Sequence, residues 1–117
     1  MPTQSIRLEG QREWRVLLRD KGKWLLGVYR PKFTSRTQVD KLEKHAGPEL
    51  FFLVKGKVNL IIKEKERIRD VALKEGQAIV TDAWHNGYRP GGEEGICLVI
   101  ERDGNPSRYL HPKGFST

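Results

Sequence analysis

The sequence predicts an all-β fold, a sandwich or a barrel, with helix limited to short fragments. Apolar and polar residues alternate with a period of two, and the alternating stretches are rich in β-branched and aromatic side chains. Turn-forming residues interrupt these stretches at intervals of roughly 8 to 12 residues, as in sandwiches and barrels. The expected strands cover residues 12–18, 24–29, 50–54, 57–63, 67–73, 77–80, 96–102 and 108–110.

The connections between these strands are short. Tight turns are expected at residues 20–23 (DKGK), 55–57 (KGK) and 64–66 (EKE). The first two are expected to be hairpins, because glycine adopts a positive φ without steric cost. Residues 39–44 are expected to form a helical turn, which Gly47-Pro48 ends before an extended strand. The stretch RPGGEEG at residues 89–95 predicts a surface loop.

Length and composition favour one soluble domain over residues 1–117, with the barrel at about residues 24–102. The chain has 117 residues, 37% of them hydrophobic and 32% charged. The longest apolar runs, at residues 50–54 and 96–100, are far shorter than the roughly 20 residues that cross a bilayer. Arginines interrupt the N-terminal stretch where a secretory signal would need apolar residues, so we expect a cytoplasmic protein without a membrane segment.

The remaining composition gives two weaker indications. Cys97 is the single cysteine and lies in the apolar run ICLVI, which predicts a core position rather than a disulfide or a catalytic thiol. Lys, Arg and Glu are plentiful while Asn, Gln, Cys and Met are scarce. This balance is typical of thermophilic proteins with surface ion-pair networks.

The net charge of +7 raises the question of nucleic-acid binding, since Lys and Arg neutralise phosphates. The positive residues are spread along the chain and often lie beside acids, as in KEKERIRD at residues 63–70. A basic nucleic-acid-binding barrel is therefore the third hypothesis. Strong salt dependence of binding to DNA or RNA would support it.

His45 and Glu49 are the first candidates for a site. They are four residues apart, so an extended strand that begins near His45 would place both on one face, together with Glu43. Leu53 would continue this face into an apolar interior, unless Gly47-Pro48 bends the chain. A histidine and a carboxylate above an apolar floor form a half-site for a divalent metal.

At this point the residues resemble the cupin family. Residues 43–56 (EKHAGPELFFLVKG) are similar to the first cupin motif from its second histidine onward: His45, three residues, Glu49, six residues, Gly56. Residues 76–85 (GQAIVTDAWH) are similar to the second motif, a glycine followed by a strand, a turn and a histidine. Glu43 stands where the family has its first histidine, and His85 arrives two residues early in the second motif.

The resemblance implies a single-domain cupin β-barrel, a jelly roll or double-stranded β-helix, with a metal ion held by His45, Glu49 and His85. Glu43 either adds a fourth ligand or faces solvent. Two histidines and two carboxylates suit Mn, Fe, Ni or Zn. Three ligands with open coordination positions would be a catalytic arrangement, because water or substrate then reaches the ion.

The neighbours of the second histidine are candidates for a substrate pocket. Trp84, Tyr88 and Arg89 are expected to stack on a substrate and to pair with its carboxylate or phosphate. The alternative is that Trp84 and Tyr88 fill the barrel and Arg89 is a surface charge. Tyr29 and Phe33 are further pocket candidates on the resemblance alone.

The first functional hypothesis is a metal-dependent cupin that binds or acts on a small oxygen-rich ligand, a sugar or a carboxylate, with anions favoured by a cationic barrel mouth near Arg89. Cupins include isomerases, dioxygenases and decarboxylases, so the resemblance selects no reaction. The second hypothesis is a ligand-binding homodimer without catalysis. Trp14 and Trp24 are expected in the core or at the dimer interface.

Overall fold

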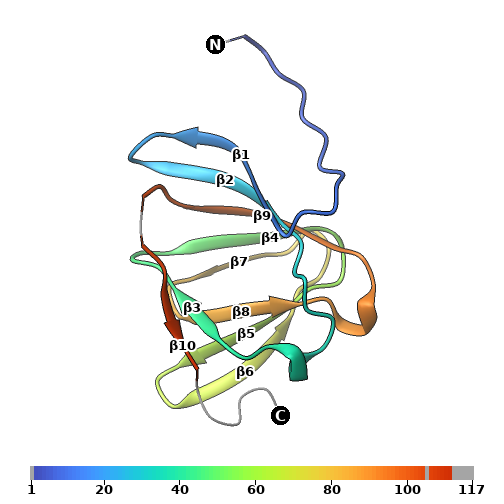
Figure 1. Ribbon diagram of the computed structural model, residues 1–117, viewed down its shortest axis with the longest axis vertical. Helices are drawn as coiled ribbons and strands as arrows, with labels where there is room; N and C mark the ends of the chain where they lie inside the picture. The colour runs from blue at the N-terminus through green and yellow to red at the C-terminus, as the bar shows by residue number, and fades with distance from the viewer. Residues whose placement is uncertain (1, 105, 112–117) are drawn as a thin grey trace.

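Two antiparallel five-stranded sheets form the molecule, as the all-β prediction requires (Figure 1). The computed structural model describes residues 2–104 and 106–111. Sheet A has the strand order β1 (Trp14–Asp20), β2 (Trp24–Tyr29), β9 (Gly95–Arg102), β4 (Glu49–Gly56) and β7 (Ala78–Thr81). Sheet B has the order β10 (Arg108–Leu110), β3 (Leu42–Lys44), β8 (Trp84–Tyr88), β5 (Asn59–Glu64) and β6 (Arg67–Ala72).

Helix is confined to two 3-10 turns, Arg36–Gln38 and Pro90–Gly92, within the described part of the chain. The second of these lies in the predicted loop at residues 89–95. No helix among the described residues is long and apolar enough to cross a membrane. The predicted domain extends over residues 1–117, of which residues 1, 105 and 112–117 lie outside the described part.

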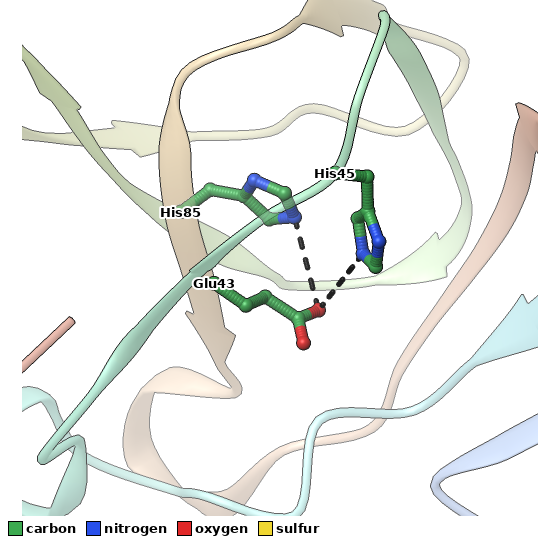
Figure 2. A group of neighbouring side chains, drawn as sticks. All are labelled: Glu43, His45 and His85. Atoms are coloured by element: carbon green, nitrogen blue, oxygen red, sulfur yellow. Dashed lines mark ion pairs between the residues drawn. The ribbon is translucent and has the colours of Figure 1, made fainter. Parts of the chain in front are cut away.

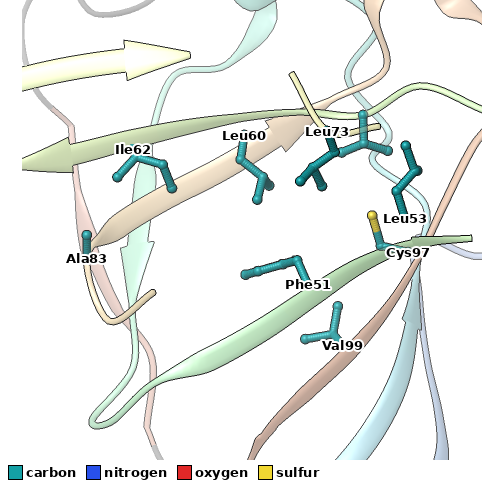
Figure 3. Close-up of a cluster of buried hydrophobic side chains, with 9 residues drawn as sticks. Phe51, Leu53, Leu60, Ile62, Leu73, Ala83, Cys97 and Val99 are labelled. Carbon is teal, nitrogen blue, oxygen red and sulfur yellow. The ribbon is translucent and has the colours of Figure 1, made fainter. Parts of the chain in front are cut away.

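The main core lies between the two sheets (Figure 3). In β4 and β9 alternate side chains point inward, so Phe51, Leu53, Cys97 and Val99 are each at most 3% exposed. The core cluster consists of Phe51, Leu53, Val58, Leu60, Ile62, Leu73, Ala83, Cys97 and Val99. Cys97 is buried, as predicted, and burial raises the pKa of its thiol to about 12.

The turn predictions are right at two places and wrong at one. Residues 20–23 form the β1–β2 hairpin, in which the Lys23 amide donates to the Asp20 carbonyl over 2.8 Å. Residues 64–66 connect the paired strands β5 and β6. Residues 55–57 form no hairpin: β4 pairs with β7 and β9, and β5 pairs with β6 and β8, so the chain crosses from sheet A to sheet B there.

Gly56 permits this crossing. It has the predicted positive φ of 83°, and a Cβ at this position would lie 1.8 Å from the Glu94 carbonyl oxygen. The glycine is therefore required by a close backbone approach as well as by φ.

The predicted helical turn at residues 39–44 is also wrong, since its second half is strand β3. The chain is extended there because Leu42 enters a second cluster on the far side of sheet B, with Val39, Ile61 and Tyr88. Strand β8 was not among the expected strands. Its inward positions hold His85 and Gly87 instead of apolar residues, so the alternating pattern is hidden in the sequence.

Candidate metal centre

The four predicted metal ligands converge at one end of the barrel interior. Glu43 is on β3, His45 lies just beyond that strand, Glu49 is the first residue of β4, and His85 is on β8. The two imidazole rings have centroids 6.1 Å apart. Figure 2 shows Glu43, His45 and His85 pointing toward one another.

The sequence predicted one continuous extended strand from His45 to Glu49, but the stretch from Glu43 to Glu49 belongs to two separate strands with a bend between them. Glu43 is the direct cross-strand partner of His85 in sheet B. The chain then bends at Gly47, whose φ is 105°, and Glu49 begins β4 in sheet A. The proposed first motif therefore supplies ligands from both sheets, and the bend, not an even register, places His45 beside Glu49.

The carboxylate oxygens lie close to the Nε2 atoms of both histidines. Glu49 Oε1 is 3.3 Å from Nε2 of His45 and 3.3 Å from Nε2 of His85. Glu43 Oε1 is 3.6 Å from Nε2 of His45 and 3.9 Å from Nε2 of His85. Both histidines thus present the same nitrogen to the same two carboxylates.

His85 is held in one orientation. Its Nδ1 atom is 2.9 Å from the Ala83 carbonyl oxygen, which can only accept, so Nδ1 carries the proton. The edge of the ring packs against Phe51, with centroids 5.3 Å apart. A fixed Nδ1–H to a backbone carbonyl is the usual support of a metal-binding histidine.

The Nε2 atom of His85 is consequently an unprotonated lone pair that faces carboxylate oxygens. It is buried and has no hydrogen-bond partner within the described part of the chain. A lone pair and an ionised carboxylate repel each other unless a cation or a proton lies between them. The arrangement therefore fits a bound cation better than an empty polar cluster.

The electrostatics of the cluster follow from burial and from its mixed charges. Burial raises the pKa of Glu49 to about 8 and lowers the pKa of His85. The hydrogen bond between Glu43 and His45 lowers the pKa of the carboxyl group and raises that of the imidazole. Glu49 and His85 are thus held toward their neutral forms, whereas Glu43 and His45 are held toward their charged forms.

The donor spacing matches that of a divalent ion. At a bond length of about 2.1 Å, neighbouring donors are about 3.4 Å apart in a tetrahedron and about 3.0 Å apart in an octahedron. The two histidine–Glu49 distances, both 3.3 Å, lie within this range, and the two histidine–Glu43 distances, 3.6 and 3.9 Å, are slightly longer. Two overlapping triads share His45: one with Glu43 and His85, the other with Glu49 and Glu101.

Glu101 is the site residue that the sequence reasoning missed. Its Oε2 atom is 3.8 Å from Nε2 of His45, and its side chain is 16% exposed. A signal was present, because Cys97 and Val99 predict the inward face of β9 and Glu101 continues it with the period of two.

The cluster lies in a cavity of about 340 Å³ with an aromatic wall and a charged rim. Tyr29 and Phe33, both predicted pocket residues, line it. Burial is the main cause that raises the pKa of the Tyr29 phenol. The complete lining is Glu13, Trp14, Tyr29, Lys32, Phe33, Lys41, Glu43, His45, Glu49, Phe51, His85, Asn86, Val99, Glu101, Ser107 and Tyr109.

The structure does not bring Trp84, Tyr88 and Arg89 into this cavity. Trp84 and Tyr88 alternate with the inward His85 on β8 and pack in the second cluster, on the opposite face of sheet B. The Tyr88 hydroxyl donates to Asp70.

The Arg89 guanidinium donates its hydrogen bonds to backbone carbonyls outside the cavity. Its Nε atom donates to the Pro31 carbonyl over 2.7 Å, and one terminal nitrogen donates to the Glu93 carbonyl over 2.9 Å. Arg89 therefore ties together two loops, and the cations that line the cavity are Lys32 and Lys41 instead.

Comparisons with known proteins identify the fold. No family model matches the chain. A 3-hydroxyanthranilate 3,4-dioxygenase from Nematostella vectensis is 38% identical over 60 residues, which are 51% of this chain and 22% of that protein. The chain thus spans about a fifth of the length of this curated relative.

Among solved structures, hydroxypropylphosphonic acid epoxidase from S. wedmorenis is similar with a TM-score of 0.66, 16% identity, and coverage of 75% of this chain and 49% of that one. A cupin-2 domain protein from Shewanella frigidimarina has a TM-score of 0.61 and 16% identity, with 81% and 85% covered. Fe(II) HppE in complex with substrate has a TM-score of 0.65 and 16% identity, with 75% and 52% covered. The chain has the cupin fold, and the resemblance of its motifs to cupins is confirmed at the level of the fold.

Proposed function

We propose that the cavity holds a divalent metal ion through His45, Glu49, His85 and Glu43, and that the ion anchors a small oxygen-rich ligand. The observation that carries this proposal is the buried Nε2 atom of His85, which faces carboxylates without a hydrogen-bond partner among the described residues. When bound, such an ion acts as a Lewis acid toward ligand oxygens.

The donor set narrows the choice of metal. Imidazole nitrogens and carboxylate oxygens suit Mn, Fe, Ni or Zn and disfavour Cu(I), which prefers sulfur. Cys97 is in the core cluster and does not line the cavity, so it offers no thiolate. A solved neighbour of the same fold is an Fe(II) protein. Fe(II) is accordingly the first metal to test.

The chain's own residues prepare the site for this role. The Ala83 carbonyl keeps the proton of His85 on Nδ1, so Nε2 is available without prior deprotonation. Phe51 and Val99 form an apolar floor beneath the donors, which limits water and strengthens the electrostatic interactions above it. Glu101, beside His45, is positioned to accept a proton from a ligand or to replace Glu43.

An anionic ligand is favoured by the rim of the cavity. The Lys32 ammonium lies 5.1 Å from the Phe33 ring centroid, and the Lys41 ammonium lies 4.8 Å from that of Tyr109. Neither ammonium group forms an ion pair with another residue that the structure describes. An oxygen-rich ligand bound to the ion at the floor would present a second anionic group to these lysines.

Metal analysis tests the proposal. Protein purified without an affinity tag, or reloaded with Fe(II), Mn, Ni or Zn, is expected to hold about one ion per chain by elemental analysis. His45→Ala and His85→Ala are each expected to lower the affinity at least about 100-fold, because each removes a direct donor. His111→Ala is the matched control, since the exposed His111 contacts the Asp40 carbonyl away from the cluster.

A parent protein that takes up none of these four metals would overturn the proposal. Uptake that His85→Ala leaves unchanged would place the ion elsewhere. Glu43→Gln and Glu101→Gln then separate the two triads: the larger loss of affinity identifies the carboxylate that completes the ligand set.

The second candidate is a ligand-binding protein without catalysis. Two histidines with Glu43 and Glu49 fill a four-coordinate ion and leave no open position for substrate, whereas a six-coordinate ion with the same donors keeps two. Water-proton relaxation in the Mn(II)-loaded protein distinguishes the two candidates. Rapidly exchanging bound water supports an open, reactive centre, and its absence supports the closed binding site.

A further inference from the structure

Trp14 is a large aromatic side chain on the inner face of sheet A that the core does not cover. It is the cross-strand partner of Tyr29, which packs against the core cluster, so both side chains point inward. Although the sequence predicts Trp14 in the core or at a dimer interface, it lines the cavity and is 37% exposed. An inward tryptophan with this exposure presents a flat apolar surface to the occupant of the cavity.

Gly27 makes room for the Trp14 ring. It precedes Tyr29 by two residues on β2, and a Cβ at this position would lie 2.6 Å from Cζ2 and 2.8 Å from Cζ3 of Trp14. The φ of Gly27 is not in the left-handed region, so the close approach of the ring, and not the backbone conformation, explains the glycine. The six-membered ring of the indole is therefore held against the β2 backbone.

The Trp14 ring lies at one end of an apolar path to the metal centre. Strand registers place Gly27 opposite Val99 on β9, and Val99 opposite Phe51 on β4. Phe51 packs against His85, with ring centroids 5.3 Å apart. Since neighbouring strands are about 4.8 Å apart, Gly27 is roughly 10 Å from Phe51. This is short enough for a ring bound over Trp14 to place an attached carboxylate at the proposed ion.

The size and lining of the cavity favour an aromatic ring over a sugar ring. A volume of about 340 Å³ is near the lower end for small-molecule sites. The Asn86 amide bonds to the backbone with both its nitrogen and its oxygen, Glu13 accepts from a backbone amide, and Ser107 lies 3.3 Å from Nδ1 of His45. Few free polar side chains remain for the hydroxyl groups of a sugar, and an unpaired buried hydroxyl costs free energy. Six lining residues are aromatic or aliphatic: Trp14, Tyr29, Phe33, Phe51, Val99 and Tyr109.

We infer that Trp14 determines the specificity of the cavity and selects a planar aromatic ring that carries a carboxylate. The inference rests on the proposed function, because the carboxylate binds the proposed ion. The ring of the ligand stacks on the indole, and a second acidic group on the ring reaches the lysines at the rim. Stacked aromatic rings add affinity beyond the area that they bury, so an aliphatic acid with the same charges binds more weakly.

Binding of phthalate and succinate by the Zn-loaded protein tests the inference. Both ligands carry two carboxylates on neighbouring carbons, and only phthalate has a ring. By calorimetric titration, Trp14→Ala is expected to weaken phthalate at least about fivefold and to leave succinate within about twofold. Trp14→Phe keeps an aromatic ring and is expected to retain most of the phthalate affinity. The zinc content of both variants is expected to match the parent, because Trp14 is not a metal donor.

Trp24→Ala is the matched control. Trp24 is also on sheet A and is 39% exposed, but it alternates with the inward Leu25 on β2, so its side chain points to the outer face. The variant is expected to leave both affinities unchanged. Circular dichroism spectra that match the parent establish that each variant is folded.

The indole resonance of Trp14 gives a second, direct readout. In the NMR spectrum of the Zn-loaded protein, phthalate is expected to shift the Trp14 Nε1–H signal through its ring current, whereas succinate is not. The Trp24 signal is expected to stay in place with either ligand. Trp14→Phe assigns the signal by removing it.

Three results would overturn the inference. The first is an equal loss of phthalate and succinate affinity in Trp14→Ala, and the second is a phthalate complex in which the Trp14 signal does not move. The third is glucuronate, an acid with a hydroxyl-rich ring, that binds more tightly than phthalate and depends on Trp14. A parent that takes up no metal would overturn the proposed function instead. The Trp14 signal of that metal-free protein then decides the inference by itself: a shift with phthalate supports it, and no shift overturns it.

Discussion

The two ends of the barrel interior are built on the same strands from opposite kinds of side chain. Along the inward face of β4 the residues run from Glu49 through Phe51 to Leu53. Along β9 they run from Glu101 through Val99 to Cys97. Four residues along one strand separate a carboxylate from a fully buried core residue. The strands supply one scaffold, and the local side chains decide whether an end stabilises the fold or prepares chemistry.

The two ends of the barrel interior have opposite effects on the free energy of folding. Burial of Leu53, which is fully buried, removes apolar surface from water and stabilises the fold. Glu49 is 4% exposed and His85 3%, and burial of their charged forms opposes folding unless a cation or a proton compensates. The polar end is therefore expected to lower the stability of the metal-free protein while the apolar end maintains it.

The largest expected effect is at the apolar end. Leu53→Ala is expected to lower the free energy of unfolding by about 2 to 5 kcal/mol, because it leaves a cavity in the closed core. Urea denaturation of the metal-free protein measures the change. Ile6→Ala, at an exposed position, is expected to remain within about 0.5 kcal/mol of the parent. Equal effects at both positions would contradict the assignment of the core.

The second largest expected effect is that of Glu49→Gln, at the polar end, on the free energy of unfolding, and this effect depends on pH. Burial raises the pKa of Glu49 from 4.5 to about 8. A carboxyl group whose pKa rises on folding stabilises the fold while protonated, and this contribution is lost as pH rises from about 4.5 through 8. Glu49→Gln does not titrate, so its stability relative to the metal-free parent is expected to increase by at least about 1 kcal/mol between pH 5 and pH 9.

Urea denaturation in the presence of a chelator, repeated across this pH range, provides the measurement. His45 and His85 remain in both proteins, so the difference between parent and variant reports Glu49 together with its effect on His45, whose pKa Glu49 raises. Glu66→Gln, in the exposed turn between β5 and β6, serves as the control and is expected to show no such trend. A parent and a Glu49→Gln variant with parallel pH profiles would show that Glu49 is not buried as a charged group.

The smallest effect is at the rim of the polar end. In the metal-loaded protein, Lys41→Met is expected to weaken binding of succinate about three- to tenfold, or about 0.7 to 1.4 kcal/mol. Butyrate lacks the second carboxylate and is expected to bind the variant and the parent equally. Calorimetric titration measures both ligands, with Lys55→Met on the outer surface as the control. Equal losses for both ligands would remove Lys41 from anion recognition.

The fold and the central residues of the cluster could be predicted from the sequence because both produce local sequence patterns. The period of two predicted the sheets, and the spacing from His45 to Glu49 and Gly56 singled out the first half of the site. The same reasoning missed strand β3 and the sheet crossing at Gly56, because these depend on which distant strands become partners. Tertiary pairing, not local propensity, decides them.

The periphery of the site was beyond sequence reasoning for a related reason. Arg89 is four residues after the proposed ligand His85, an even spacing that would keep it on the inward face of a longer strand. Strand β8 ends at Tyr88, however, and the following loop carries Arg89 to the Pro31 carbonyl. Lys41 lies only two residues before Glu43, but the helical turn expected over residues 39–44 gave it no place in the cavity, and Glu101 enters from the distant strand β9. Glu101 alone had a readable signal, the inward period of β9.

The central claim is that the polar end of the barrel is a metal centre. The most direct test is X-ray absorption spectroscopy of the bound ion, in the fine structure above its absorption edge. The loaded parent is expected to show nitrogen and oxygen donors at about 2.1 Å with the outer-shell scattering of two imidazole rings. His85→Ala, if it is loaded at high metal concentration, is expected to show one ring. A spectrum without imidazole scattering, or one that His85→Ala leaves unchanged, would contradict the account.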